Sequence, residues 1–225
     1  MKKIRDPAQI HMWMEKGNIR DCFSTPDLDF QLYRYEKGEQ ITSPDKRLEE
    51  LLFVVKGTIR VYGLRNNGTI SPVNQQNAPI LLGDIEFAEQ GPTPFFAEAV
   101  TDVICIALAI QPYEKLLHTD IRFLHVLLHA YVEKLQLFAF VEAPAETIAD
   151  RVLLYLKNFC PTHELNGIEA AVLQLRCSRR QLQRVLQKLC AEGEIEKIGR
   201  GRYRLATHAE HRSGISIEQN GSQRN

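Results

Sequence analysis

Hydrophobic and polar positions alternate over short runs in the first half of the chain, and turn residues separate the runs. β-Branched and aromatic residues dominate these runs from Phe30 to Ile110. Gly and Pro punctuate them, and Asn67-Gly68 is typical of a tight hairpin turn. Regularly spaced short strands without intervening helices predict an antiparallel β-sandwich or jelly roll.

The pattern changes to helical spacing after this strand region. Apolar residues recur three and four positions apart between Pro112 and Glu142, which predicts one long helix. Pro144 is expected to break this helix and act as a hinge, and a helical pattern resumes from Glu146 to Phe159. The long helix is too apolar along one stripe to serve only as a connector.

Two further helical patterns follow, separated by a turn of about three or four residues, as in a helix-turn-helix. Asn166 and Glu169 form the pattern of a capping box at the start of the first. Ser178 and Gln181 form the same pattern at the start of the second. The second helix has one apolar face, made by Leu182, Val185, Leu186 and Leu189.

The opposite face of this last helix carries the side chains Arg180, Gln183, Arg184 and Gln187. Guanidinium and amide groups are the ones that form paired hydrogen bonds with guanine and adenine edges. Arg179, in the first turn, can reach a phosphate or a base, and Ser178 can hold a phosphate. An ordinary solvated basic face is the alternative interpretation.

A β-hairpin pattern follows the helix and decides between these interpretations. Gly193 ends the helix, residues 194–198 alternate like a strand, and Gly199-Arg200-Gly201 forms a turn before residues 202–205 return. The arrangement predicts a winged helix-turn-helix. Arg200 and Arg202 are expected at the wing tip, within reach of a phosphate backbone.

The charge distribution favours a nucleic-acid contact in the C-terminal part. The 225-residue chain has a formal net charge of zero. Residues 1–143 contain 15 Lys and Arg against 19 Asp and Glu, whereas residues 144–206 contain 11 against 7. The basic surplus thus coincides with the predicted winged helix-turn-helix.

No stretch approaches the ~20 apolar residues that a membrane-spanning helix needs. The N-terminus also lacks the apolar run of a signal peptide. We therefore expect a cytoplasmic protein with no membrane contact. The polar composition of residues 207–225 predicts a disordered tail.

The order of these motifs resembles the CRP/FNR family of transcription regulators. The C-terminal resemblance runs from Ala171 through Cys177-Ser178-Arg179-Arg180 to Arg184, and on to the Gly199-Arg200-Gly201 wing. Three further runs are similar to the family's cyclic-nucleotide-binding-type β-roll: Tyr35–Ile41, Leu52–Tyr62 and Gly83–Phe87. The resemblance covers roughly Leu32 to Leu205, and within the family the chain is most similar to the YeiL-type members.

The resemblance implies an α+β fold: an antiparallel β-roll (jelly roll) over residues 1–110, a long dimerisation helix over 111–143 and a winged helix-turn-helix over 144–206. The dimer contacts would be Leu124, Leu128, Tyr131, Leu135 and Phe138. Two recognition helices would then read an inverted repeat in double-stranded DNA. RNA polymerase and a small-molecule effector are further partners compatible with the family.

The chain departs from the family at the phosphate cassette of the β-roll. Members that bind cyclic nucleotides carry Gly-Glu and, further along, Arg-Ser or Arg-Thr, whose guanidinium neutralises the cyclic phosphate. Pro94 and Phe95 stand at the Arg-Ser positions here. A buried phosphate without a cation is costly, so we expect no tight binding of cAMP or cGMP, and the effector stays unknown. The remaining pocket candidates are Gly83, Asp84, Glu86, Phe95 and Phe96.

Three other functions have to be considered: a redox-responsive regulator, a winged helix that binds a protein, and an enzyme. The five cysteines, which include no Cys-x-x-Cys pair, are Cys22, Cys105, Cys160, Cys177 and Cys190. The oxygen-sensing branch of the family holds an iron-sulfur cluster through closely spaced N-terminal cysteines, and this region has only Cys22. A redox-responsive regulator using cysteines or a cluster stays an alternative, as does a winged helix that binds a protein.

An enzyme of cupin type is the third class. It needs a metal triad on its strands, but residues 30–110 contain no His. His118, His125 and His129 lie nearly in line on the long helix, without a carboxylate or Cys in register. We therefore expect no metal site and no catalytic activity.

Overall fold

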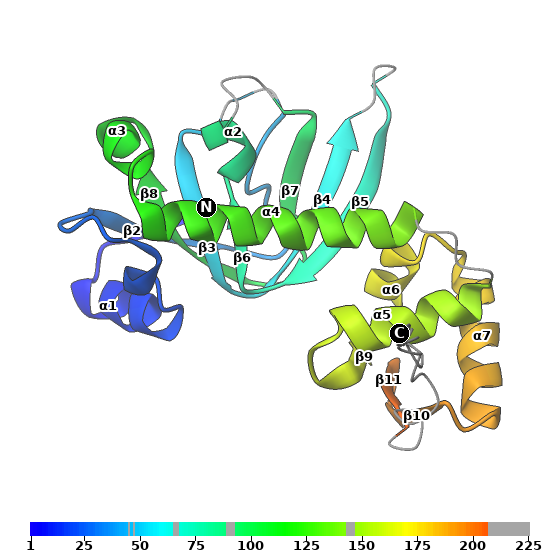
Figure 1. Ribbon diagram of the computed structural model, residues 1–225. Coiled ribbons are helices and arrows are strands. Elements are labelled where there is room, and N and C mark those ends of the chain that lie inside the picture. The colour runs from blue at the N-terminus through cyan, green and yellow to red at the C-terminus, as the bar shows by residue number, and fades with distance from the viewer. Residues whose placement is uncertain (45, 47, 65–67, 89–92, 143–146, 207–225) are drawn as a thin grey trace, which may run out of the picture. The chain divides into compact units, whose positions relative to one another are not determined.

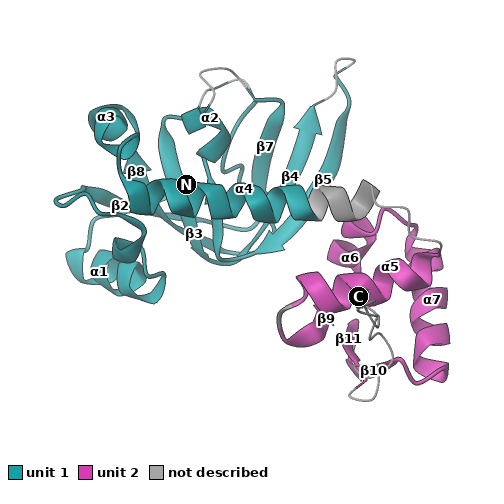
Figure 2. Ribbon diagram, viewed as in Figure 1, with its two compact units in different colours: residues 1–143 teal, residues 144–225 magenta. Residues whose placement is uncertain are grey.

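The computed structural model describes the chain except for residues 45, 47, 65–67, 89–92, 143–146 and 207–225, and it does not describe the side chains of 137–142 and 161 (Figure 1). The predicted hinge at Pro144, the predicted tail and Asn67 lie outside the described residues. The chain forms two compact units, residues 1–143 and 144–225, shown in teal and magenta in Figure 2.

Unit 1 contains two antiparallel sheets. The larger has the strand order β1 (Lys2–Ile4), β2 (Phe30–Tyr35), β8 (Val103–Ala109), β3 (Glu50–Lys56), β6 (Ile80–Leu82). The smaller has the order β5 (Ile70–Asn77), β4 (Thr58–Leu64), β7 (Phe95–Ala99). The predicted antiparallel β-roll is confirmed, although a short helix, α2 (Asp84–Ala88), interrupts the run of strands.

Apolar residues line both faces of the larger sheet, because consecutive residues of its central strands are apolar and point to opposite sides. Leu32, Phe53 and Ile106 lie in the cluster on one face, which also contains residues of the helices. Tyr33, Leu52 and Cys105 lie in the cluster on the other face, together with Ile59 and Ala97 of the smaller sheet. Unit 1 therefore has three layers: helices, the larger sheet and the smaller sheet.

The helical layer includes α1 (Pro7–Lys16), η1 (Arg20–Cys22) and the start of the long helix. Asp6 begins α1, since its carboxylate accepts a hydrogen bond of 3.0 Å from the N–H of Ala8. Phe23 follows η1, and its ring stacks on that of Phe123 with 5.2 Å between the centroids. This aromatic contact joins the N-terminal segment to the long helix.

The prediction of one helix from Pro112 to Glu142 was wrong at its start. The segment contains η2 (Gln111–Tyr113), α3 (Glu114–Leu117) and then α4 (Ile121–Glu142). Asp120 separates α3 from α4, because its buried carboxylate accepts a hydrogen bond from the N–H of Phe123 (3.1 Å), as an N-cap residue does. The same carboxylate accepts bonds from the N–H groups of Ser24 (2.8 Å) and Thr25 (2.7 Å).

Unit 2 has the predicted order of a winged helix-turn-helix. It contains α5 (Ile148–Phe159), η3 (Pro161–His163), β9 (Glu164–Asn166), α6 (Ile168–Gln174), α7 (Arg179–Ala191), β10 (Ile195–Gly199) and β11 (Arg202–Leu205). The strands form one antiparallel sheet in the order β10-β11-β9. The helices meet through buried residues, among them Val152, Leu156, Leu175, Leu182 and Leu186.

The predicted capping box of Asn166 and Glu169 is wrong. Helix α6 begins after Gly167, which has φ +100° and provides no side-chain cap. The Asn166 side chain instead accepts a hydrogen bond of 2.9 Å from Nε of Arg202. The cap pattern fails because Asn166 ends a strand and its amide is used across the sheet.

None of the helices within the described part of the chain is sufficiently long and apolar to cross a bilayer.

Replacing Asp120 with Ala is expected to lower the free energy of unfolding of unit 1 by about 2 to 3 kcal/mol, because a helix cap is lost and the N–H groups of Ser24 and Thr25 lose their acceptor. Urea unfolding followed by the fluorescence of Trp13, the single Trp of the chain, measures this change. The matched control is Asp21→Ala on η1, which is exposed and should change the value by less than about 0.5 kcal/mol.

The same comparison has an expected pH dependence. Burial by itself raises the pKa of Asp120, but hydrogen bonds from Thr25, Ser24 and Phe123 outweigh burial and lower the pKa from 3.8 to about 2. A lowered folded-state pKa means that the stabilisation is complete above pH 3.8 and is lost as the pH falls through about 2. A difference between wild type and variant that stays constant over this range would contradict the assignment.

Candidate nucleic-acid interface

The start of α7 is fixed by the predicted capping box, which is confirmed. The N–H of Ser178 donates to Oε1 of Gln181 at 2.9 Å, and the N–H of Gln181 donates to Oγ of Ser178 at 3.2 Å. Arg176, in the turn before it, has φ +45°. These contacts define the first turn of α7 and hence the direction of the side chains that follow.

Helix α7 separates its apolar residues from its polar ones as predicted. Leu182, Leu186 and Leu189 are buried in unit 2. The side chains predicted to read bases are all exposed along the helix: Arg180, Gln183, Arg184 and Gln187. The buried leucines fix the orientation of the helix, so that the exposed groups form one polar surface.

The arginines predicted to contact DNA fall into two groups by their contacts. Arg179 pairs with Glu169 of α6, with 2.6 Å between Nη1 and Oε1. Arg202 pairs with Glu164 of β9, with 3.1 Å between Nη2 and Oε2. Arg180, Arg184 and Arg200 form no ion pair with any residue that the structure describes. The second group therefore carries charge that no described residue neutralises through an ion pair.

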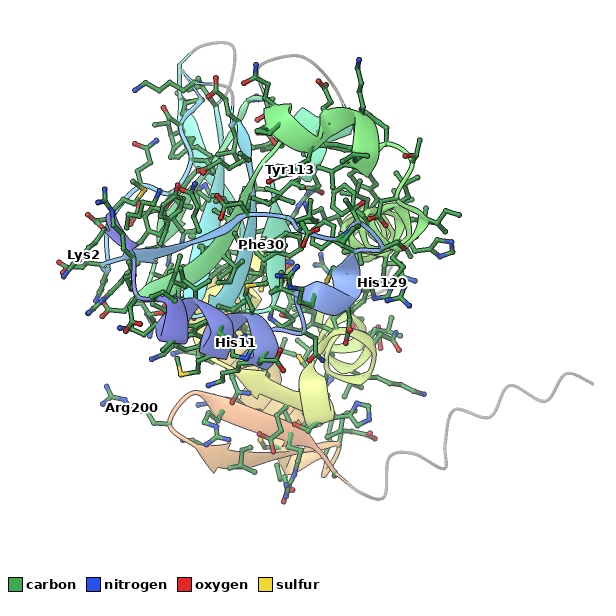
Figure 3. All side chains as sticks on the ribbon, turned by 90° about the vertical axis from the view of Figure 1, so that its left-hand side faces the viewer. Lys2, His11, Phe30, Tyr113, His129 and Arg200 are labelled. Carbon is green, nitrogen blue, oxygen red and sulfur yellow. The ribbon has the colours of Figure 1, made fainter. Side chains whose placement is uncertain are left out.

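The wing is the hairpin of β10 and β11. Gly201 has φ +70°, and Arg200 extends from the turn between the strands (Figure 3). Arg202 begins β11 beside Asn166 of β9, so its guanidinium lies over the sheet rather than at the tip. The expected wing-tip position thus fits Arg200 and does not fit Arg202.

The pocket candidates of the roll make separate contacts with their neighbours. Thr93 donates to Glu86 through its hydroxyl (3.0 Å), which ties α2 to the start of β7. Phe96 stacks on Tyr62 of β4 with 5.1 Å between centroids. Phe95, its neighbour on the strand, points to the opposite side and lies next to Gly63. Gly83 has φ +89°, and a Cβ there would lie 2.5 Å from the carbonyl oxygen of Glu50.

Asp84 makes a contact that the sequence did not indicate. Its side chain is buried, and its Oδ2 lies 2.5 Å from Nζ of Lys134 on α4. The hydroxyl of Tyr131, one turn earlier on α4, donates to the carbonyl oxygen of Asp84 at 2.6 Å. A candidate pocket carboxylate is therefore already neutralised by the long helix.

Helix α4 has a second apolar face whose side chains are largely exposed. Phe123 and Leu127 are buried, whereas Ile121, Leu128 and Leu135 are 69%, 59% and 65% exposed. Leu124 and Val132 extend the exposed stripe. Tyr131, predicted on the dimer side, contacts Asp84 at the edge of the buried face, and the side chain of Phe138 lies outside the described residues.

The cysteines have the character of packed, protonated thiols. All five are free, and burial raises the pKa of each, to about 12 for Cys105 and Cys160. Protonated thiols are poor metal ligands and poor nucleophiles. Within the described residues no group of three His, Cys, Asp or Glu side chains could hold a metal ion.

Three comparisons with known proteins agree with this architecture. Residues 32–120 match the family described as Cyclic nucleotide-binding domain. "Regulatory protein YeiL" of Escherichia coli O157:H7 is 28% identical over 115 residues, which span 51% of this chain and 52% of YeiL. The chain therefore matches only about half of the length of that curated relative.

Two solved structures illustrate the likeness in fold. FixK2 from Bradyrhizobium japonicum superposes with a TM-score of 0.61 at 20% identity, covering 79% of this chain and 93% of FixK2. A transcriptional regulator of the CRP family from Thermus thermophilus superposes with a TM-score of 0.55 at 18% identity, again covering 79% and 93%. The class of protein is thus a β-roll of the cyclic-nucleotide-binding type joined to a winged helix-turn-helix.

More narrowly, residues 32–120 match the cyclic nucleotide-binding domain, the chain is similar to the regulatory protein YeiL over about half of its length, and it has the fold of the CRP/FNR transcription regulators. The resemblance predicted from the sequence is confirmed.

Replacing Lys134 with Met keeps most of the side-chain length but leaves the buried Asp84 carboxylate without its cation. We expect the free energy of unfolding of unit 1 to fall by about 3 kcal/mol. The double variant Asp84→Asn, Lys134→Met should recover most of this loss, because it also removes the buried charge. Urea unfolding of both variants measures the effect, with Lys115→Met on the exposed side of α3 as the control. Equal losses in the single and double variants would argue against the pairing.

Proposed function

We propose that the protein is a dimeric transcription regulator that reads an inverted repeat in double-stranded DNA through α7. The observation that carries this proposal is the polar surface of α7, where Arg180 and Arg184 stand exposed and without an internal ion pair to any described residue. The homology to YeiL and the CRP-type fold support the same function. The protein would act in the cytoplasm, without a catalytic role, and RNA polymerase would be its partner at a promoter.

The contacts of each side chain suggest its role. Arg180, Gln183, Arg184 and Gln187 would contact base edges in the major groove. Ser178 and Arg200 would contact phosphates on either side. Arg179 and Arg202, which we predicted as DNA contacts, are held by Glu169 and Glu164 and would reach a phosphate only as secondary contacts that also orient α6, α7 and β9.

The exposed stripe of α4 supports a homodimer. Ile121, Leu124, Leu128 and Leu135 follow the spacing of a two-stranded coiled coil. Exposed apolar side chains of this size are otherwise unfavourable in water, and a second copy of α4 would cover them. A dimer with two-fold symmetry places its recognition helices in successive major grooves about 34 Å apart, which is why an inverted repeat is expected.

The roll would not hold a cyclic nucleotide. Pro94 and Phe95 supply no cation for a phosphate, and the Lys134 ammonium is already paired with Asp84. Placing a phosphate there would leave an uncompensated charge. Titration calorimetry with cAMP and cGMP should therefore show no saturable binding; affinity in the micromolar range would contradict the loss of the clamp.

Selection of bound duplexes from a pool of random DNA sequences tests whether the protein recognises a specific sequence. The wild-type protein should enrich an inverted repeat, with an affinity that falls as salt rises. Arg184→Ala should relax the preference at one base pair in each half-site and cost about 1 to 3 kcal/mol of binding free energy. Arg122→Ala removes the same charge from α4 and should leave the preference unchanged.

Two outcomes of the selection would count against this function. Enrichment of the same site by wild type and Arg184→Ala would exclude a base contact by Arg184. Absence of salt-dependent DNA affinity in the wild-type protein would favour the alternative, a winged helix used for protein contacts.

Replacing Leu128 with Glu should convert the dimer into a monomer, because the substitution places a carboxylate in the apolar stripe opposite its copy. Sedimentation velocity measures the change in mass. Arg122→Glu, on the polar side of α4, is the matched control and should stay dimeric. A wild-type protein that sediments as a monomer at every concentration would exclude the proposed interface.

A further inference from the structure

A groove of about 410 Å³ lies between α1, η1 and β2 of unit 1. Figure 3 looks onto this side of the unit, with His11 of α1 and Phe30 of β2 labelled. Phe30 belongs to the helix-covered face of the larger sheet, so the groove is separate from the roll interior on the other face. The volume lies at the lower end of the range of about 300 to 1,000 Å³ that small-molecule sites occupy.

The groove has an apolar floor. Met14, Leu28 and Phe30 line it and are buried, and Ile10 lines its side. These residues come from α1, from the segment before β2 and from β2 itself, so the floor is held by packed elements. An apolar group that entered the groove would lose its contact with water, which favours binding.

The rim of the groove carries charges of both signs. Glu15, Arg20 and Asp29 all line it, and none of the three forms an ion pair with another described residue. The guanidinium carbon of Arg20 lies 5.6 Å from the ring centroid of Phe30, which keeps the cation above the apolar floor. A cation and two carboxylates thus surround one apolar cavity without neutralising one another.

We propose that this groove binds a free α-amino acid with an apolar side chain. The carboxylate of the ligand would pair with Arg20, and its ammonium would pair with Glu15 and Asp29. Its side chain would lie against the half-buried Ile10 and the small accessible parts of Met14, Leu28 and Phe30. A purely anionic ligand would meet the two carboxylates, and a purely cationic ligand would meet the guanidinium. A zwitterion satisfies both signs.

The groove is connected to the dimer helix through contacts within unit 1. Arg20 belongs to η1, which Phe23 follows, and the Phe23 ring stacks on Phe123 of α4. The next residues, Ser24 and Thr25, bind the Asp120 carboxylate at the start of α4. Ligand binding in the groove would therefore affect the start of α4 through these contacts. Binding itself can be measured without DNA and does not depend on the proposed function.

Titration calorimetry with L-leucine, L-phenylalanine and L-methionine on the full chain tests the proposal, with Trp13 fluorescence on α1 as a second readout for L-leucine. We expect saturable binding at micromolar to millimolar concentration. N-acetyl-L-leucine lacks the ammonium and L-leucinamide lacks the carboxylate, and each should bind about tenfold more weakly or worse. Because these comparisons use the wild-type protein, they do not depend on the folding of a variant.

Substitutions at two exposed residues, one that lines the groove and one that does not, test where the ligand binds. Arg20→Gln should weaken L-leucine binding by about tenfold and should remove the penalty for L-leucinamide. Lys16→Gln is the matched control, because Lys16 lies over the Trp13 ring (5.0 Å) and does not line the groove. Absence of saturable binding by all three amino acids, equal affinity of the capped analogues, or an equal effect of Lys16→Gln would each overturn the proposal.

Discussion

Helix α4 has two apolar faces, one buried in unit 1 and one exposed, and the rest of the structure depends on which residues lie on each face. One face buries Phe123 and Leu127 against the larger sheet, while Leu128 and Leu135 on the other face are left to solvent. Which residues belong to which face is decided where the helix begins, because each residue advances the helix by about 100°. The buried carboxylate of Asp120 sets that beginning. It lies between α3 and α4 and caps α4. It also accepts hydrogen bonds from the N–H groups of Ser24 and Thr25, which are close in space but come from the N-terminal part of the unit's sequence.

Features with local causes could be predicted from the sequence. The strands follow from alternation, and the start of α7 follows from the Ser178 and Gln181 pattern, whose two hydrogen bonds join residues three apart. Asp120 was missed because its partners Ser24 and Thr25 lie about a hundred positions away in the chain, although they are adjacent in space. The capping box predicted at Asn166 was wrong for the same reason, since the Asn166 amide oxygen accepts a hydrogen bond from Arg202 of β11, and Gly167 is the N-cap residue of α6.

The candidate interface was predicted as a set of residue types, and the structure divides that set by contact. The sequence treats Arg179 and Arg180 alike, as neighbours in the first turn of one helix. One of them meets a carboxylate of α6, while the other points to solvent, and this difference depends on the crossing of two helices. A guanidinium with an internal partner must give up that pairing before it can bind an external anion. The arginines that form no ion pair with a described residue, Arg180, Arg184 and Arg200, are therefore the ones with charge available for a phosphate or a base.

The pairing of Asp84 with Lys134 bears on what the roll does in this chain. A buried carboxylate is tolerated only with a partner, and α4 supplies it through the Lys134 ammonium, while the Tyr131 hydroxyl one turn earlier binds the backbone carbonyl oxygen of the same residue. The contacts of Asp84 with Lys134 and Tyr131 thereby hold α4 against the roll, with the apolar stripe of the helix exposed. A ligand is then not needed to attach the helix to the roll. An effector would have to act either by breaking this contact or, as in the proposed groove, through α1 and η1 on the same helix-covered face of the larger sheet.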